Sequence, residues 1–270
     1  MNVHDIAAVL ERLAPSGLAY EWDRVGLSIG DPNAPVDKVL VALTVTRGAL
    51  DAARQAGADL IVSHHPVIWR PLDALRTNDP ETRLCLDLVA AGIACYAVHT
   101  NLDVAPRGIN AVLARRLGLG SCEPLLHAPQ ATLVKLVTFV PKEHVAAVRE
   151  AVCGAGAGTI GDYTCCTFAS PGVGTFLPGA DAQPYTGQRG ELYQEKELRF
   201  ETVVAKARLG AVVKALIDAH PYEEVAYDVL SLANPDAAVG LGMRGELDAE
   251  MTLEGFARRA CDALELPHVR

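Results

Sequence analysis

The sequence predicts an α/β (α+β) protein, with an N-terminal α/β domain built on parallel strands and a ferredoxin-like domain after it. Short apolar runs that alternate with helical patterns predict the first domain, because a strand, a helix and a second strand in that order imply parallel pairing. The expected strands are residues 39–43 and 59–63, which we expect to be buried, and residues 93–98. The expected helices are 49–55, 84–91 and 109–117.

A second pattern begins near Thr132. Its order of strand, helix and strand, taken twice, is typical of a ferredoxin-like module. The expected elements are a strand at 133–140, a helix at 142–153, loops and strands up to Gly190, a strand at 197–204, a helix at 209–219 and a strand at 225–232.

Amphipathic helices are expected near both ends, at residues 6–13 after a polar start, and at 252–264 with Thr252 as N-cap. We therefore divide the chain into residues 1–128, the first α/β domain, 129–236, the ferredoxin-like domain, and 237–270, the start of a further segment of the α/β domain.

The composition narrows the class of protein. With 270 residues and 50% hydrophobic residues the chain can bury a core in each domain, and no apolar run reaches the roughly 18 residues needed to cross a membrane. A formal net charge of −9 makes nucleic acid an unlikely partner. The charged residues among the first fifteen argue against a signal peptide, so we expect a cytoplasmic protein. The seven cysteines are odd in number and include no C-x-x-C pair, so we expect them to be reduced thiols.

Two expected strands end in metal-binding residue types. The strand at 59–63 leads into His64 and His65, and the strand at 93–98 leads into His99, with Asp103 four residues later. Because parallel strands deliver their carboxyl ends to one edge of a sheet, these side chains are expected to meet there.

Imidazole and carboxylate donors together suit Zn, Fe, Mn, Co or Ni. A single histidine is more often an ordinary hydrogen-bonded residue than a ligand, but the two clusters at equivalent strand ends favour a divalent transition metal. We expect His64, His65 and Asp103 to be metal ligands. We expect His99 to be the catalytic group that moves protons. Two other roles for His99 stay open: it could be a further metal ligand, or it could orient one of the ligands.

Three sequence blocks resemble the GTP cyclohydrolase type 2-like, Ngg-interacting-factor-three-like family: EWDRVGLSIGD at 21–31, SHHP at 63–66 and HTNLD at 99–103. The resemblance implies a toroidal homohexamer with a dinuclear metal centre, two ions per subunit. It also implies that the ferredoxin-like domain is an inserted PII/CutA-like module that forms trimers, on residues 158–163, 174–179 and 220–224.

The sequence departs from this family at three places. Thr44 stands where members usually have an acidic residue, and Arg24, where Asn is common, puts a cation near the expected site. Members also continue past the segment at 267–270 into a second α/β half that supplies further His and Glu ligands. We therefore expect the chain to be a fragment or a shortened member, which can hold one metal but not a bridged pair.

Other motifs are given plainer interpretations. The G-x-G-x-x-G pattern at 156–161 follows a helix, so we expect tight turns and not a dinucleotide site. The HPYEE segment at 220–224 is expected to be a loop rather than a second metal or effector site, and Cys165 and Cys166 have no neighbouring histidine to support nucleophilic catalysis.

The sequence thus predicts a metal-dependent hydrolase that acts on a nucleotide-like or phosphoester small molecule. The alternative is a non-catalytic, metal-handling or ligand-sensing oligomer.

Overall fold

The computed structural model describes residues 1–128 and 131–269. Contacts divide the chain into two compact units, unit 1 with residues 1–130 and 237–270, and unit 2 with residues 131–236. The expected start of the second domain, at residue 129, lies outside the described residues. The fold class is confirmed, with parallel strands in unit 1 and antiparallel strands in unit 2.

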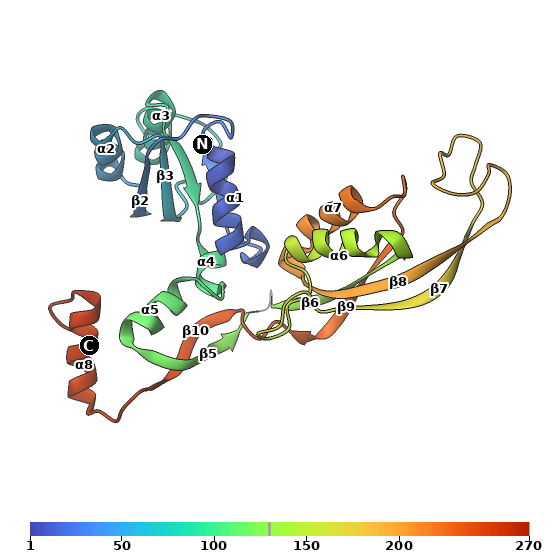
Figure 1. Ribbon diagram of the computed structural model, residues 1–270. Helices are drawn as coiled ribbons and strands as arrows, with labels where there is room; N and C mark the ends of the chain where they lie inside the picture. Colours follow the sequence, from blue (N-terminus) through green and yellow to red (C-terminus); the bar gives the residue numbers. More distant parts are fainter. Residues whose placement is uncertain (129–130, 270) are drawn as a thin grey trace. The chain divides into compact units, whose positions relative to one another are not determined.

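Unit 1 contains a four-stranded sheet in the order β1-β4-β3-β2, and its strands β2 and β3 are labelled in Figure 1. Its strands are β1 (Gly26–Ile29), β2 (Val39–Thr44), β3 (Leu60–His65) and β4 (Ala94–Ala97). The β2–β3 and β3–β4 pairs are parallel, and β1 pairs with β4 in the antiparallel direction. The crossover helices α2 (Arg47–Ala56) and α3 (Pro80–Ala90) connect the parallel strands.

Local signals fix the ends of the helices in unit 1. Asn2 and Asp5 form a capping box at the start of α1 (Val3–Leu13). The Thr46 side chain accepts the Ala49 N–H at the start of α2, and Gly57 ends this helix in the left-handed conformation. Asp79 caps α3, which has Pro80 in its first turn.

The core of unit 1 lies between its sheet and the crossover helices. Leu50 of α2, Leu88 of α3 and Ile61 of β3 are fully buried in one apolar cluster. Burying a side chain of this size contributes about 1.5–3 kcal/mol. This packing holds the strand ends that carry His64 and His65 at a fixed place.

The edge strand β2 corrects one expectation. We expected residues 39–43 to be buried, but Val41 is 79% exposed and Leu43 is 67% exposed. Leu40 and Ala42 do pack on the core, because alternate residues of a strand face opposite ways. In the part of the chain that the structure describes, the other face of β2 is open to solvent.

The rest of unit 1 follows the sheet. It comprises η1 (Ser16–Leu18), α4 (Thr100–Val104), α5 (Ile109–Leu117), β5 (Leu119–His127), β10 (Gly240–Leu247) and α8 (Leu253–Leu264). Strands β5 and β10 form an antiparallel pair. The expected helix at 109–117 and the Thr252 cap of α8 are confirmed.

Unit 2 has the expected order of strands and helices. Its elements are β6 (Thr132–Pro141), η2 (Lys142–His144), α6 (Val145–Gly154), β7 (Thr167–Phe176), β8 (Tyr193–Ala205), η3 (Lys206–Arg208), α7 (Leu209–Ala219) and β9 (Tyr227–Pro235). The sheet order is β7-β8-β6-β9, with antiparallel pairs, which is the ferredoxin-like arrangement. Helices α6 and α7 lie side by side, and Val148, Leu216 and the strand residue Phe200 are fully buried between helices and sheet (Figure 1).

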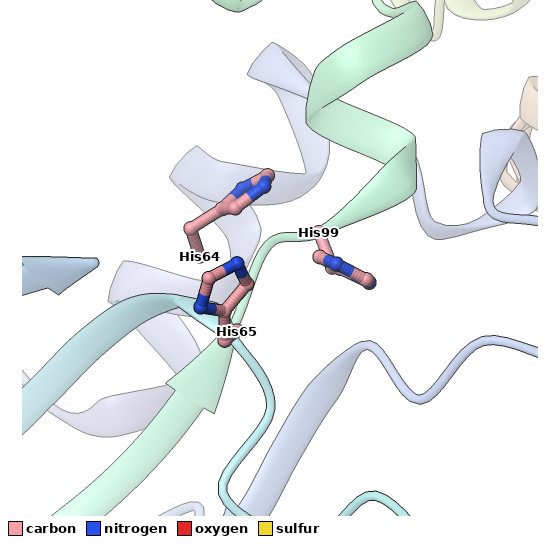
Figure 2. A group of neighbouring side chains, drawn as sticks. All are labelled: His64, His65 and His99. Atoms are coloured by element: carbon pink, nitrogen blue, oxygen red, sulfur yellow. The ribbon is translucent and has the colours of Figure 1, made fainter. Parts of the chain in front are cut away.

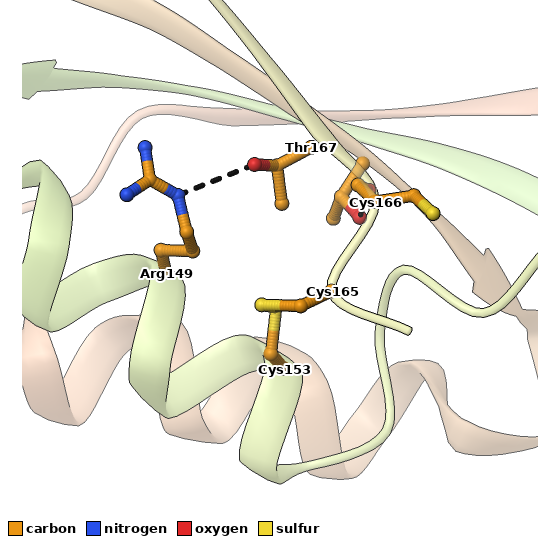
Figure 3. Close-up of a disulfide and its surroundings, with 6 residues drawn as sticks. Arg149, Cys153, Cys165, Cys166 and Thr167 are labelled. Atoms are coloured by element: carbon orange, nitrogen blue, oxygen red, sulfur yellow. Dashed lines mark hydrogen bonds between the residues drawn. A yellow bond between two sulfur atoms is a disulfide. The ribbon is translucent and has the colours of Figure 1, made fainter. Parts of the chain in front are cut away.

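A disulfide joins Cys153, near the end of α6, to Cys165, just before β7 (Figure 3). The expectation that all seven cysteines are reduced thiols is therefore wrong for this pair, while Cys85, Cys95, Cys122, Cys166 and Cys261 are free. The two sulfur atoms meet because the intervening chain turns back on itself. Gly158, with φ of +76°, donates its N–H to the Val203 carbonyl and accepts the Cys166 N–H, so the glycines of the 156–161 pattern serve turns, as expected.

Across residues 1–128 and 131–269, every helix is too short or too polar to traverse a bilayer.

Candidate metal centre

The histidines of the candidate site stand at the carboxyl ends of neighbouring parallel strands. His64 and His65 are the last residues of β3, and His99 follows β4 directly before α4. Strands β3 and β4 are in register at Ser63 and Ala97, and β2 and β3 at Thr44 and His65. The parallel pairing therefore brings His99 next to His64 and His65, although it is 34 or 35 positions from them in the sequence.

The three imidazole rings are close enough to share one ion (Figure 2). One ligand atom of each of His64, His65 and His99 lies within 4.8 Å of the others, and all three residues are partly buried. The ring centroids are 5.1 Å apart for His64 and His65, 4.9 Å for His64 and His99, and 5.7 Å for His65 and His99. Both His64 and His65 belong to β3, whose pairing with β2 extends to His65, and Pro66 directly follows the strand.

Hydrogen bonds fix which nitrogen of each ring is available. The Nδ1 of His64 lies 3.1 Å from the Val98 carbonyl oxygen, which can only accept, so this Nδ1 carries the proton. The Nδ1 of His65 lies 2.7 Å from the Thr44 hydroxyl. The Nε2 of His64 is therefore left with its lone pair, and Nε2 is the nitrogen of His65 that this bond leaves open.

His99 is oriented by a buried carboxylate. Its Nδ1 donates to Asp23 Oδ1 at 2.8 Å, and Asp23 also accepts from the backbone N–H of Thr100 at 3.0 Å and of Arg24 at 2.7 Å. Burial opposes ionisation of Asp23, but the hydrogen bonds from Thr100 and His99, with those of the backbone, outweigh it and lower the pKa of this carboxyl. A carboxylate that holds the outer nitrogen of an imidazole is characteristic of histidines that bind metals.

Asp103 lies beside the cluster without joining it. It is carried by α4, and its Oδ1 is 3.7 Å from the Nε2 of His64, beyond hydrogen-bond distance. Its side chain is 30% exposed. The assignments of Asp103 as a ligand and of His99 as a catalytic group both stay predictions.

Aromatic side chains stand next to the histidines. The Trp69 ring lies 5.5 Å from the His99 ring and the Trp22 ring 6.4 Å from it, both edge to face, and the two tryptophans are 5.8 Å apart. Tyr20 stacks on Trp22 at 5.6 Å with an interplanar angle of 13°. Trp22 is 57% exposed and Trp69 is 44% exposed, so planar apolar surface remains open beside the cluster. We call Trp22 and Trp69 the aromatic wall.

Two of these neighbours were weakly signalled in the sequence. In the sequence, an aspartate such as Asp23 is equally compatible with a capping role, and nothing in the loop after β3 marks Trp69 as a neighbour of His99. Arg24 is exposed, and its backbone N–H contributes to holding Asp23.

The donor set fits a borderline transition metal. Neutral imidazole nitrogens bind Zn²⁺ and its neighbours in the first transition row, with a nearby carboxylate as a further oxygen donor. The HPYEE segment does not offer a comparable set, because both nitrogens of the buried His220 are engaged. Its Nε2 donates to the Phe139 carbonyl at 3.0 Å, and its Nδ1 accepts the Tyr222 N–H at 3.2 Å. The expectation of a structural loop there agrees with these bonds.

The whole chain, residues 1–270, matches the family described as Duf34/NIF3 (NGG1p interacting factor 3). The chain belongs to this family. It is similar to the GTP cyclohydrolase 1 type 2 homolog of Halalkalibacterium halodurans, with 43% identity over 269 residues that cover 100% of this chain and 72% of the relative. The protein of the same name from Bacillus subtilis is 43% identical over 270 residues, with coverage of 100% and 72%.

A solved Duf34/NIF3 structure agrees with the fold. The Bacillus cereus protein related to NIF3 superimposes with a TM-score of 0.81 and 42% sequence identity, and the match covers 100% of this chain and 72% of that one. The resemblance inferred from the three sequence blocks is thereby confirmed.

Proposed function

We propose that this Duf34/NIF3 protein binds a divalent transition metal at His64, His65 and His99 and uses it to hydrolyse a small molecule. The observation that carries the proposal is the arrangement of the three rings. Their Nδ1 atoms are held from outside by Val98, Thr44 and Asp23, which leaves the Nε2 atoms for an ion. Preparing three ring orientations in this way lowers the cost of binding a metal.

A bound ion of this kind lowers the pKa of a water molecule and polarises a carbonyl or phosphoryl oxygen. The residues supply the rest. Thr44 and the Val98 carbonyl keep the first two rings from turning, Asp23 does the same for His99, and Asp103 is the carboxylate beside the ring nitrogens that can complete the set of ligands. These donors suffice for one ion in this chain. His99 can serve as a third ligand or as the group that moves a proton, and the two roles predict different metal contents of a His99 variant.

The aromatic wall supports a substrate with a planar ring. The partly exposed rings of Trp69 and Trp22 have their centroids 5.5 Å and 6.4 Å from that of His99, and they can stack on a nucleobase or a related heterocycle. Arg24 adds an exposed cation next to Asp23, which suits a phosphate. We therefore favour a nucleotide-like or phosphoester substrate, and we place the reaction in a homohexamer or another oligomer built on trimers, in the cytoplasm.

The test is metal analysis together with a screen for hydrolysis. The full chain, loaded with zinc, iron or manganese, should hold about one equivalent of metal and should release product from at least one nucleotide or phosphoester. His64→Ala should remove both properties, whereas His4→Ala, a change on the exposed side of α1, should leave both intact. Metal below about a tenth of an equivalent in the unchanged protein would refute the proposal.

The second candidate is a non-catalytic protein that handles metals or senses a ligand. Unit 2 contains none of the three histidines and has a cavity of its own, and this observation favours the second candidate. Metal-dependent turnover that His64→Ala abolishes would exclude this candidate, and full metal content without turnover would support it.

A further inference from the structure

Unit 2 contains a cavity of about 670 Å³ near one end of its sheet. Strand β8 pairs with β6 only as far as Glu197 opposite Pro141, but its pairing with β7 continues to Tyr193 opposite Phe176. The ribbon of β7 and β8 therefore extends past β6, as Figure 1 shows. The segments after β7 and after α7 close the space beside it. Cavities of this volume accommodate drug-sized molecules.

Glu197 gives this cavity a buried negative charge. It lines the cavity with only 8% of its surface exposed, and its Oε1 accepts the Tyr222 hydroxyl at 2.8 Å. Its Oε2 faces Gly174 across the ribbon, where a Cβ would come within 2.1 Å of this oxygen. The absence of a side chain at Gly174 thus makes room for the Glu197 carboxylate itself, which the Tyr222 hydroxyl also holds in place.

The remaining charges of the cavity are also mainly negative. Glu223 and Glu224 line it, against the single lining cation Arg199. The Nε of Arg199 lies 3.7 Å from a carboxylate oxygen of Glu201, so part of its charge is balanced outside the lining. The cavity therefore attracts cations and repels anions.

Aromatic rings contribute to the apolar part of the lining, beside aliphatic side chains such as Val173 and Leu177. Tyr185 and Tyr222 lie 5.9 Å apart with an interplanar angle of 44°, and Phe139 and Phe176 add two further rings. The Tyr185 hydroxyl is hydrogen-bonded to His144 at 3.0 Å, so both tyrosine rings are anchored by their polar ends. Fixed aromatic faces next to a carboxylate recognise ammonium and amidinium groups through cation–π and ionic contacts together.

We propose that this cavity binds a small organic cation, with its charged nitrogen against Glu197 and the two tyrosine rings and its apolar body against the rest of the lining. A bare divalent metal is a poorer occupant, because apolar and aromatic side chains make up much of the lining. The site lies wholly within unit 2, so the proposal is independent of the metal centre and would give unit 2 the role of sensing an effector.

The test is calorimetric and NMR titration of the full chain with matched probes. Phenethylamine and benzyltrimethylammonium are the cations, and phenethyl alcohol is the neutral analogue of the first. We expect both cations to bind and the alcohol to bind at least about tenfold more weakly. The tyrosine ring signals of Tyr185 and Tyr222 should shift with the cations.

Glu197→Gln should weaken the binding of both cations by about tenfold or more, because the amide keeps an acceptor for Tyr222 but loses the charge. The control is Glu150→Gln, which removes one negative charge from the exposed side of α6 and should leave binding unchanged.

The proposal is wrong if the amine and the alcohol bind equally, if neither cation binds, or if Glu197→Gln has no effect in a folded chain. It is also wrong if native mass shows an oligomer in which the Tyr185 and Tyr222 signals respond to none of the probes, since a second copy then fills the cavity. If Glu197→Gln fails to fold, as judged by circular dichroism, the comparison of amine with alcohol on the unchanged chain still decides the matter.

Discussion

The side chains of His99 in unit 1 and His220 in unit 2 are both largely buried and both hydrogen-bonded, but their ring nitrogens have different partners. His99 gives its Nδ1–H to Asp23, which leaves its Nε2 open, and its ring lies beside two other imidazoles. His220 donates from Nε2 to a carbonyl and accepts a backbone N–H at Nδ1. An imidazole next to acidic residues is therefore a candidate metal ligand only when its hydrogen bonds leave one nitrogen open.

The largest effects are expected when the two imidazole rings are removed one at a time. His99→Ala should lower the metal content at least about tenfold, because it deletes one of three nitrogen donors. His220→Ala should leave the metal content unchanged and reduce the free energy of unfolding by about 1–3 kcal/mol, since it leaves a buried carbonyl and an N–H without their partner.

Metal analysis and urea unfolding of the two variants measure these effects. Full metal content in His99→Ala together with lost turnover would instead assign this residue to proton transfer. Loss of metal in His220→Ala would invalidate the distinction between the two histidines.

A smaller effect is expected from the residue that orients His99. Asp23→Asn keeps an oxygen that can accept from His99, but its amide N–H₂ then faces the Thr100 N–H. Because two donors oppose each other, the amide must shift, and the His99 ring loses its fixed orientation. We expect metal affinity to fall by about 10–100-fold. Competition with a fluorescent chelator measures the affinity, and Asp59→Asn is the matched control, because Asp59 accepts only from the backbone of Asp37 and Lys38 in the hydrogen bonds of this region. Equal affinities in the two variants would contradict the role given to Asp23.

The smallest effect concerns the phenol of unit 2. Burial, reinforced by the hydrogen bond to Glu197 and the charge of that carboxylate, raises the pKa of Tyr222. A group whose pKa is higher in the folded state stabilises the fold below its unfolded pKa of about 10, and this contribution disappears as the pH rises through the folded pKa. Tyr222→Phe should therefore lower the free energy of unfolding by about 1 kcal/mol near neutral pH, with a difference that narrows above about pH 10.

Urea unfolding at a series of pH values measures this difference, and metal content should not change. A difference that is constant across the alkaline range would show that the titration of Tyr222 is not coupled to folding.

The parts of the fold that were predicted from sequence are those with strong local patterns. Helix α7 has the predicted bounds, and the parallel strands were recognised from continuous apolar runs. Strand β7 was not delimited, because Pro171, Gly172 and Gly174 interrupt the apolar alternation, and it is held instead by its pairing with β8. Strand β5 is largely exposed and strand β10 is partly buried, and neither shows a continuous apolar run in the sequence.

The candidate site was predictable where the sheet topology determines it. Parallel pairing of β3 with β4 makes the approach of His99 to His64 and His65 a consequence of register. The surrounding residues depend on loops. Asp23 meets His99 across 76 residues of sequence, and Trp69 comes from a segment without a regular pattern. The disulfide likewise depends on the glycine turns between its cysteines, which spacing alone does not specify.

Strand β2 is both the outer strand of its sheet and the strand that carries Thr44, whose hydroxyl lies 2.7 Å from His65. A hydrogen bond of that length weakens when its atoms move apart by a few tenths of an ångström. A contact at the open edge, or on the uncovered side chains of Val41 and Leu43, that shifted this strand would therefore weaken the hydrogen bond that orients the His65 ring. The orientation of the His65 ring therefore depends on the position of the outermost strand of the sheet.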